Sequence, residues 1–147
     1  MIVRLIEERD IAQALAIQTG LPQIAQWTAA DYDLSGRAGM IGWVADDGQR
    51  AAGFLVARHI ADEFEILNLA VNVFERRRGA GTLLLSAALH WAVAQGATNA
   101  YLEVRESNSV AIQFYKHHRF EIRGRRPRYY ASPTEDALVL AATLEKS

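Results

Sequence analysis

The sequence predicts an α/β (α+β) fold: a mixed, twisted and mostly antiparallel sheet of about six to seven strands with helices on both faces. Three observations support this prediction. Short apolar segments joined by hairpin signals occupy the first half of the chain and favour antiparallel pairing. Two β-α-β passages follow and favour a parallel pair beside them. The chain has 147 residues and is half apolar, which suits one domain over residues 1–147.

The beginning of the chain predicts one strand and two helices. Residues 1–6 alternate as a short strand does, and apolar residues within 11–17 recur as on an amphipathic helix. Thr28 predicts the N-cap of a second helix that ends near residues 35–36. The sequence pattern is weakest over residues 20–39, so the structure of this segment is the least defined.

Three strands are predicted in the middle of the chain. Residues 41–45 and 51–59 are strand-like, and Asp46-Asp47-Gly48 between them is a hairpin signal. A turn at residues 62–63 leads into a longer strand over 64–73. We therefore expect an antiparallel meander here.

The second half alternates helices with strands and closes on two antiparallel strands. Gly96 and Asn108 mark helix ends, as a C-terminal stop and an N-cap. The predicted elements are a helix over 82–95, a strand over 100–104, a helix from 108 to about 118, and strands over 120–124 and 137–144.

Composition excludes several kinds of protein. The formal net charge of −1 gives no global electrostatic case for binding nucleic acid or an anionic membrane. The chain has no cysteine, so disulfides, thiolate metal sites and a cysteine nucleophile are excluded. Its four histidines lack metal-ligand spacing, so no metal is expected. No secretory signal or membrane-length apolar run is visible, and a cytoplasmic protein is expected.

A basic glycine turn, Arg76-Arg77-Arg78-Gly79-Ala80-Gly81, lies between a predicted strand and a predicted helix. The first N–H groups of a helix have no partner within it, and glycines let the backbone approach an anion closely. We expect most of the binding to come from the backbone of residues 79–82, with the arginines in support. The alternative is a tight strand-to-helix connection with solvated arginines.

Two other phosphate motifs do not fit this turn. The nucleoside-triphosphate loop needs four residues between its glycines and then Lys and Ser or Thr, which are missing. The dinucleotide fingerprint needs a third small residue where Leu84 stands.

Residues 71–81 resemble the acetyl-CoA pyrophosphate loop of the GNAT superfamily of N-acetyltransferases, whose core is Gln/Arg-x-x-Gly-x-Gly/Ala. A downstream segment resembles the second CoA-binding segment of that superfamily: Leu102-Glu103-Val104-Arg105-x-x-Asn108-x-x-Ala111-Ile112-x-x-Tyr115-x-x-x-x-Phe120. The likeness covers residues 65–140 and implies the GNAT fold with acetyl-CoA as co-substrate and no metal. The residues it assigns to the co-substrate are Leu69, Ala70, Val71, Arg76, Arg77, Arg78, Gly79, Ala80, Gly81, Thr82 and Asn108.

Two side chains are implied as catalytic. Glu103 lies in an apolar strand context, where burial raises the pKa of a carboxyl group, and the resemblance makes it the general base. The alternative for Glu103 is an ion pair with Arg105 or with an arginine of residues 123–128. Tyr115 shares a helix face with Asn108, and the resemblance makes it the general acid; the alternative is an aromatic core residue. Asn108 is expected as a helix cap, and the resemblance also makes it a contact to the pantetheine or cysteamine arm.

Other contacts are implied more indirectly. In the family, the strand holding Leu69–Val71 splays from its neighbour, so that its free N–H and C=O groups pair with pantetheine; an ordinary paired strand is the alternative. Tyr129 and Tyr130, placed on a late loop, either hold the acceptor backbone or belong to a surface hairpin. Trp27 either packs in the core or shapes the acceptor groove.

The chain is also similar to the bacterial ribosomal-protein alanine N-acetyltransferases, in residues 68–71, 102–105 and 128–130. This implies acetylation of a protein N-terminal α-amino group, with a ribosomal protein as the candidate acceptor. Alternatives are a small-molecule amine as acceptor, or a non-catalytic acetyl-CoA-binding module. The basic, aromatic late loop favours an acidic or neutral peptide. Arg119 stands where the family usually has glycine, so we expect this arginine to take a left-handed backbone conformation.

Overall fold

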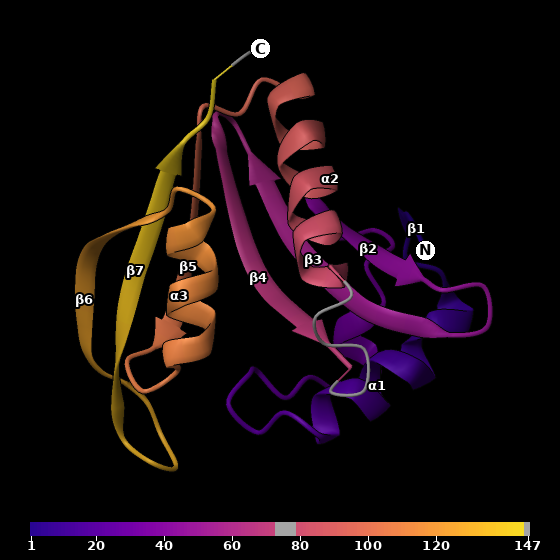
Figure 1. The fold of residues 1–147 in the computed structure, drawn as a ribbon, viewed down its shortest axis with the longest axis horizontal. Coiled ribbons are helices and arrows are strands. Elements are labelled where there is room, and N and C mark those ends of the chain that lie inside the picture. Colours follow the sequence, from indigo (N-terminus) through magenta and orange to yellow (C-terminus); the bar gives the residue numbers. More distant parts are fainter. Residues whose placement is uncertain (73–78, 146–147) are drawn as a thin grey trace.

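The computed structural model describes residues 1–72 and 79–145 (Figure 1). Its strands form one seven-stranded sheet in the order β1-β2-β3-β4-β5-β7-β6. All neighbours are antiparallel except β4 and β5. The strands are β1 (Ile2–Leu5), β2 (Met40–Asp46), β3 (Ala51–Ile60), β4 (Glu63–Val71), β5 (Asn99–Arg105), β6 (Glu121–Tyr130) and β7 (Glu135–Thr143). The helices are α1 (Ile11–Thr19), α2 (Ala80–Ala94) and α3 (Ser109–His117), with short 3-10 turns η1 (Glu8–Asp10) and η2 (Ala30–Tyr32).

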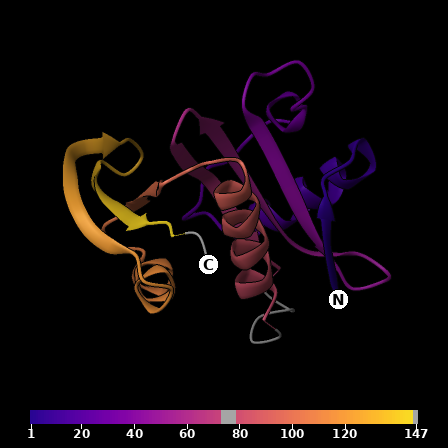
Figure 2. The same cartoon turned by 90° about the horizontal axis from the view of Figure 1, so that it is seen from above.

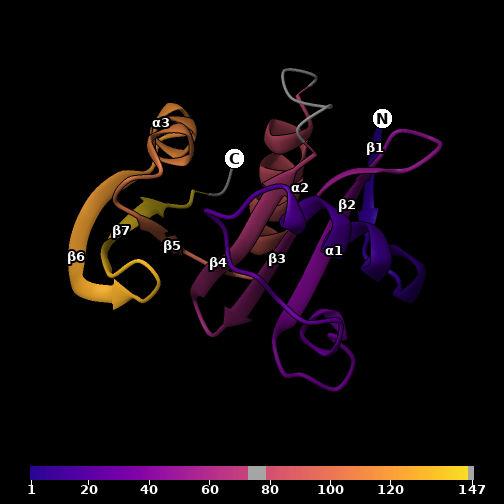
Figure 3. The same ribbon diagram turned by 90° about the horizontal axis from the view of Figure 1, so that it is seen from below.

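Helices cover both faces of the sheet, as predicted. Figures 2 and 3 show α2 and α3 on one face and α1 on the other. Each face has its own core, one built on α2 and one on α1. Residues 51–57 of β3 are all buried, because the strand is covered on both sides. None of the described helices has the length and hydropathy that a membrane span requires.

The parallel strands β4 and β5 separate partway along their length. Their pairing covers only Glu63–Ile66 of β4 against Asn99–Leu102 of β5. Beyond that point β4 continues beside β3 as far as Val71, whereas β5 continues beside β7 as far as Arg105. The two ribbons diverge accordingly in Figure 1. The splay predicted from the family resemblance is therefore present, and an ordinary paired strand is excluded for this part of β4.

The helix predicted after Thr28 is wrong, because only the 3-10 turn η2 forms there. The N-cap of this turn is Ala29, one residue after Thr28. The Thr28 hydroxyl accepts from the Asp31 N–H at 3.3 Å, and the Thr28 N–H donates to Asp31 Oδ2 at 2.8 Å. Asp33 then accepts from both the backbone N–H and the hydroxyl of Ser35. This local side-chain pairing competes with helical hydrogen bonds and ends the element.

A buried glutamine instead orders the segment after α1. The Gln18 side chain, 5% exposed, donates to the Trp27 carbonyl and accepts from the Trp27 N–H and the Tyr32 hydroxyl. Trp27 then packs on Tyr32 with ring centroids 5.2 Å apart, against the α1-side core. The core interpretation of Trp27 is therefore the one the structure supports.

The last hairpin differs from the prediction, because β6 runs on to Tyr130 where a loop was expected. Asp136 of β7 holds this extension: its carboxylate accepts from Arg125 Nη1 at 2.8 Å and from the Arg128 N–H at 2.9 Å. Register shifts between Arg126 and Tyr130 accommodate Pro127, which has no N–H to donate. Such irregularity is tolerated because β6 is an edge strand.

The backbone has a positive φ at two helix ends, Gly96 and Arg119, as predicted. Gly96 has φ +93° and ends α2, as expected for a C-terminal stop. Arg119 has φ +71° after α3, so the arginine does take the left-handed conformation. A non-glycine residue there strains the backbone by about 1 kcal/mol.

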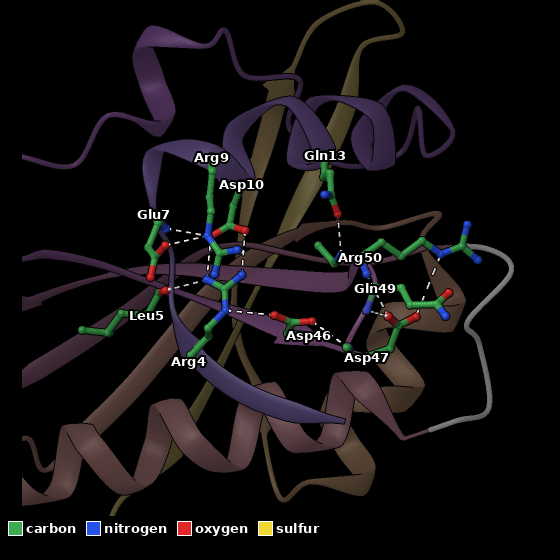
Figure 4. Close-up of polar contacts among 12 residues, drawn as sticks. Arg4, Leu5, Glu7, Arg9, Asp10, Gln13, Asp46, Asp47, Gln49 and Arg50 are labelled. Carbon is green, nitrogen blue, oxygen red and sulfur yellow. Dashed lines mark hydrogen bonds and ion pairs between the residues drawn. The ribbon is translucent and has the colours of Figure 1, made fainter.

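An ion-pair cluster fastens β1 to its neighbours (Figure 4). The Arg4 guanidinium contacts both oxygens of Asp10 at 2.8 Å, and its Nε contacts Asp46 Oδ2 at 3.1 Å. Asp10 is only 3% exposed and also accepts from the Glu7 N–H. A bidentate pair of this kind is among the stronger electrostatic contacts.

Asp10→Asn is expected to lower the free energy of unfolding by about 2–3 kcal/mol, because it leaves Arg4 partly buried without its main partner. The hydrogen bond from Arg4 holds the pKa of Asp10 below its ordinary value. The stabilisation is therefore complete above about pH 4 and disappears as the pH falls through the lower folded-state pKa. Urea unfolding at several pH values measures both effects. The exposed carboxylate Glu8, changed to Gln, is the control; an Asp10→Asn loss no larger than that control would contradict the prediction.

Candidate active site

The open edge of β4 presents unpaired backbone groups. The Asn72 N–H donates to the Ala52 carbonyl at 2.7 Å, and the register places Ala70 opposite Phe54. Hydrogen-bonded pairs alternate in antiparallel strands, so Ala70 bonds to β3, whereas Leu69 and Val71 turn their N–H and C=O groups away from it. Since β5 has left this edge, those groups face the splay. Of the three residues predicted to contact the co-substrate through their backbone, Leu69 and Val71 thus direct their N–H and C=O groups toward the open edge of β4.

The glycine turn opens into the first turn of α2. Gly79 is its N-cap, with φ +81° and open space around the position a Cβ would take. Gly81 packs more closely, since a Cβ there would lie 3.4 Å from the Phe114 ring and 3.6 Å from Val71 Cγ2. The free N–H groups of this turn make it a site for an anion. Arg76, Arg77 and Arg78 lie outside the described residues.

Helix α3 brings Asn108 and Tyr115 to the same place. The Asn108 side chain accepts from the Ala111 N–H at 3.2 Å, which confirms its predicted role as N-cap. Tyr115 is 5% exposed, and its ring lies 5.2 Å from that of Phe114 and 5.4 Å from that of Phe120. Burial raises the pKa of Tyr115 well above its ordinary value. Its hydroxyl has no hydrogen-bond partner among the described residues and keeps its proton at neutral pH.

A cavity of about 570 Å³ joins these three elements. It runs between the open edge of β4, the first turn of α2 and one face of α3. Eight of its lining residues were predicted as co-substrate contacts: Leu69, Ala70, Val71, Gly79, Ala80, Gly81, Thr82 and Asn108. Every predicted co-substrate residue within the described ranges therefore faces one cavity.

A second cavity of about 340 Å³ adjoins the first. The two share a wall that includes Tyr115, formed by the residues that line both cavities: Gln23, Ile24, Leu69, Asn108, Ala111 and Tyr115. Glu103 and Tyr130 line only the second. The predicted acid and the predicted base are thus brought to adjoining spaces, although twelve positions separate them in the chain.

Glu103 has the ion-pair partner that its alternative interpretation required. Its Oε1 lies 3.0 Å from Nε of Arg126, a member of the basic run noted in the sequence. Arg105 is not that partner, because it pairs with Glu135 at 3.1 Å. The Glu103 side chain is 12% exposed and still reaches the second cavity. The ion pair and the position at the cavity therefore occur together.

Tyr129 and Tyr130 both lie near Glu103 but interact with it differently. A hydrogen bond to the Glu103 carboxylate, with burial second, raises the pKa of Tyr129. Burial and then the charge of Glu103 raise the pKa of Tyr130 to about 12. Arg105 lies over the Tyr130 ring at 4.5 Å, and Arg126 over the Tyr129 ring at 5.6 Å. Tyr130 lines the second cavity directly, whereas Tyr129 contacts it through Glu103.

Sequence reasoning left one member of this site unresolved and missed another. It offered an arginine of residues 123–128 as a partner for Glu103, but no local pattern distinguishes Arg126 from Arg125. Asn68, 6% exposed, donates to the Ala25 carbonyl at 3.2 Å and so fixes the loop that walls the second cavity. Its burial in a strand edge could be recognised only once the pairing was known. Among the described residues, no group of three or more His, Asp or Glu side chains could hold a metal ion.

Residues 9–120 match the model of the acetyltransferase (GNAT) family. The chain belongs to this family. Enzymes of the GNAT family use acetyl-CoA, and membership confirms the predicted family and places the chain among the acyltransferases.

Several proteins resemble the chain. A ribosomal protein bS18-alanine N-acetyltransferase of Salmonella typhimurium is 36% identical over 99 residues, 66% of each chain. The Escherichia coli protein of the same name is 32% identical over 94 residues, 63% of this chain and 64% of its own. The matches therefore span just under two thirds of these relatives.

Solved structures show the same fold. The crystal structure of the Escherichia coli ribosomal-protein-S18-alanine N-acetyltransferase has a TM-score of 0.86, at 23% identity over 99% of this chain and 95% of that one. Arabidopsis thaliana NAA60, crystallised in complex with acetyl-CoA, has a TM-score of 0.83 at 18% identity, covering 97% and 98% of the two chains. These likenesses confirm the GNAT fold predicted from the sequence.

Proposed function

We propose that residues 1–147 act as one cytoplasmic acetyltransferase domain that moves the acetyl group of acetyl-CoA to the N-terminal α-amino group of a protein. The observation that carries this proposal is the meeting of two cavities at Tyr115, one lined by the co-substrate residues and one by Glu103. The similarity to bS18-alanine N-acetyltransferases supports a protein N-terminus as acceptor, with a ribosomal protein as the first candidate.

The larger cavity fits acetyl-CoA in two respects. The first turn of α2, from Gly79 to Thr82, offers backbone N–H groups to a pyrophosphate, with the arginines of 76–78 as proposed support. The free edge of β4 at Leu69 and Val71 offers donors and acceptors to the amide-containing pantetheine arm, as an added strand would need. When bound, acetyl-CoA supplies an activated thioester.

Glu103 and Tyr115 then carry the two proton transfers of the reaction. Glu103 accepts the proton that the attacking amine loses, either directly or through a water molecule. The Tyr115 hydroxyl donates its proton to the departing sulfur. A backbone N–H of the β4 edge near Leu69 polarises the thioester carbonyl. Tyr129 and Tyr130 are proposed to hold the acceptor beside Glu103. Positioning of the two substrates supplies much of the rate.

Glu103→Gln is expected to lower turnover by about tenfold at pH 7. The loss is moderate because a free α-amino group has a pKa of about 7.7–8.0, so part of it is already neutral. The pH–rate profile measures the effect: the variant should follow the neutral fraction of the acceptor, whereas the wild type should remain active at lower pH. An unchanged acidic limb would remove Glu103 as base. Glu106→Gln, which alters an exposed carboxylate outside both cavities, is the control.

Ion pairs reduce the basic charge on which the expected acceptor preference rests. Three of the four arginines in residues 123–128 are paired with carboxylates: Arg123 with Glu121, Arg125 with Glu106 and Asp136, and Arg126 with Glu103. Their charge is therefore partly offset within the protein, which weakens the reason to prefer an acidic peptide.

A thioester-consumption assay over N-terminal peptides and small amines tests the proposed function. Peptides that begin with alanine are expected to react fastest. Faster reaction with a polyamine, amino acid or aminoglycoside would favour the small-amine alternative. Acetyl-CoA binding without reaction on any acceptor would favour a non-catalytic module.

A further inference from the structure

A histidine that the proposed mechanism does not use lies beside the phosphate end of the larger cavity. His118, at the C-cap of α3, places its Nε2 3.2 Å from the Thr82 hydroxyl in the first turn of α2. Thr82 lines the cavity, as does Phe114, whose ring centroid is 4.7 Å from that of His118. The imidazole is thus one hydrogen bond removed from the expected position of the pyrophosphate.

The direction of this hydrogen bond depends on the tautomer and on the protonation state of His118. A neutral imidazole whose Nε2 lacks a proton accepts from the Thr82 hydroxyl, so that the hydroxyl proton points away from the cavity. In the imidazolium, Nε2–H donates to Thr82 Oγ1, and the hydroxyl proton is free to donate to an anion in the cavity. The neutral tautomer with its proton on Nε2 gives the second arrangement as well, whereas protonation of the imidazole from solvent excludes the first arrangement and leaves only the second.

The surroundings favour the neutral form until an anion arrives. Burial and then the nearby His117 lower the pKa of His118. Its ring lies 5.2 Å from that of His117, and Lys116 and Arg119 flank it in the chain. None of the described carboxylates pairs with His118, and Phe114 and Thr82 carry no charge. A pyrophosphate would bring negative charge close to this imidazole, and a nearby anion stabilises the imidazolium.

We propose that His118 is a positioning residue for the pyrophosphate turn: it takes up a proton when acetyl-CoA binds and turns the Thr82 hydroxyl toward the phosphate. The inference rests on the proposed use of acetyl-CoA. It makes the affinity for acetyl-CoA fall as the pH rises from about 5.5 to 8. The adjacent His117, which does not contact Thr82, has no such role.

Calorimetric titration with acetyl-CoA across this pH range tests the proposal, in buffers of different ionisation heat. The proteins are the wild type, His118→Asn, Thr82→Val, the double variant and, as matched control, His90→Asn, which changes an exposed histidine outside both cavities. The wild type and His90→Asn are expected to lose affinity about fivefold more than His118→Asn does over the range, and to take up a fraction of a proton. Titration of the ligand's own phosphates is common to all the proteins and cancels in this comparison.

The Thr82→Val background is expected to remove most of the effect of His118→Asn, because the hydroxyl carries the coupling. Equal pH dependence and proton uptake in wild type and His118→Asn would overturn the inference while leaving the proposed function intact. Absence of acetyl-CoA binding to the wild type at every pH would overturn both. A far-ultraviolet spectrum of each variant confirms that the chain is folded.

Discussion

Replacing Gly81 with tryptophan is expected to weaken acetyl-CoA binding by about 100-fold or more, which corresponds to about 2.7 kcal/mol. Gly81 lines the larger cavity, and a Cβ there already lies 3.4 Å from the Phe114 ring and 3.6 Å from Val71. An indole at this position has no space behind it and must occupy the cavity. Its own backbone is helical, so tryptophan is compatible with the local conformation.

Calorimetry with acetyl-CoA measures this effect, and thermal unfolding reports whether the variant is folded. Leu83→Trp is the matched control, because Leu83 lies on the same helix turn, is 42% exposed and lines neither cavity. The control is expected to bind as the wild type does. Unchanged affinity of a folded Gly81→Trp protein would show that the co-substrate binds elsewhere.

Tyr115→Phe is expected to lower kcat by about 100-fold while leaving the affinity for acetyl-CoA nearly unchanged. The substitution removes one hydroxyl, which has no partner among the described residues, and keeps the ring packed against Phe114 and Phe120. The fold and the cavity wall are thereby preserved. What is lost is the proton at the point where the two cavities meet.

Steady-state turnover at saturating acetyl-CoA, with the dissociation constant measured separately, distinguishes a chemical role from a binding role for Tyr115. Because burial raises the pKa of Tyr115, its deprotonation should produce no alkaline loss of wild-type activity below about pH 10. Tyr101→Phe, on β5 and outside both cavities, is the control. Equal turnover in Tyr115→Phe and wild type would exclude the hydroxyl as the acid.

The sequence alone was sufficient where the determining interactions are local. The hairpin at residues 46–48, the stop at Gly96 and the cap at Asn108 each depend on neighbours within a few positions, and the structure confirms them. The family resemblance added the splay at Leu69–Val71. Where two local preferences competed, as after Thr28, periodicity predicted a helix that side-chain hydrogen bonds prevent.

The amino-acid sequence by itself determined the fold class and most of the elements, because hydrophobic period and turn chemistry act over short distances. The eight predicted residues that line the larger cavity came from the family resemblance. Tertiary structure decided the rest. The pairing of Glu103 with Arg126 depends on β7 lying between β5 and β6 in the sheet, and that of His118 with Thr82 depends on how α3 packs near α2. Such contacts join residues far apart in the chain, and only the packed sheet brings them within bonding distance.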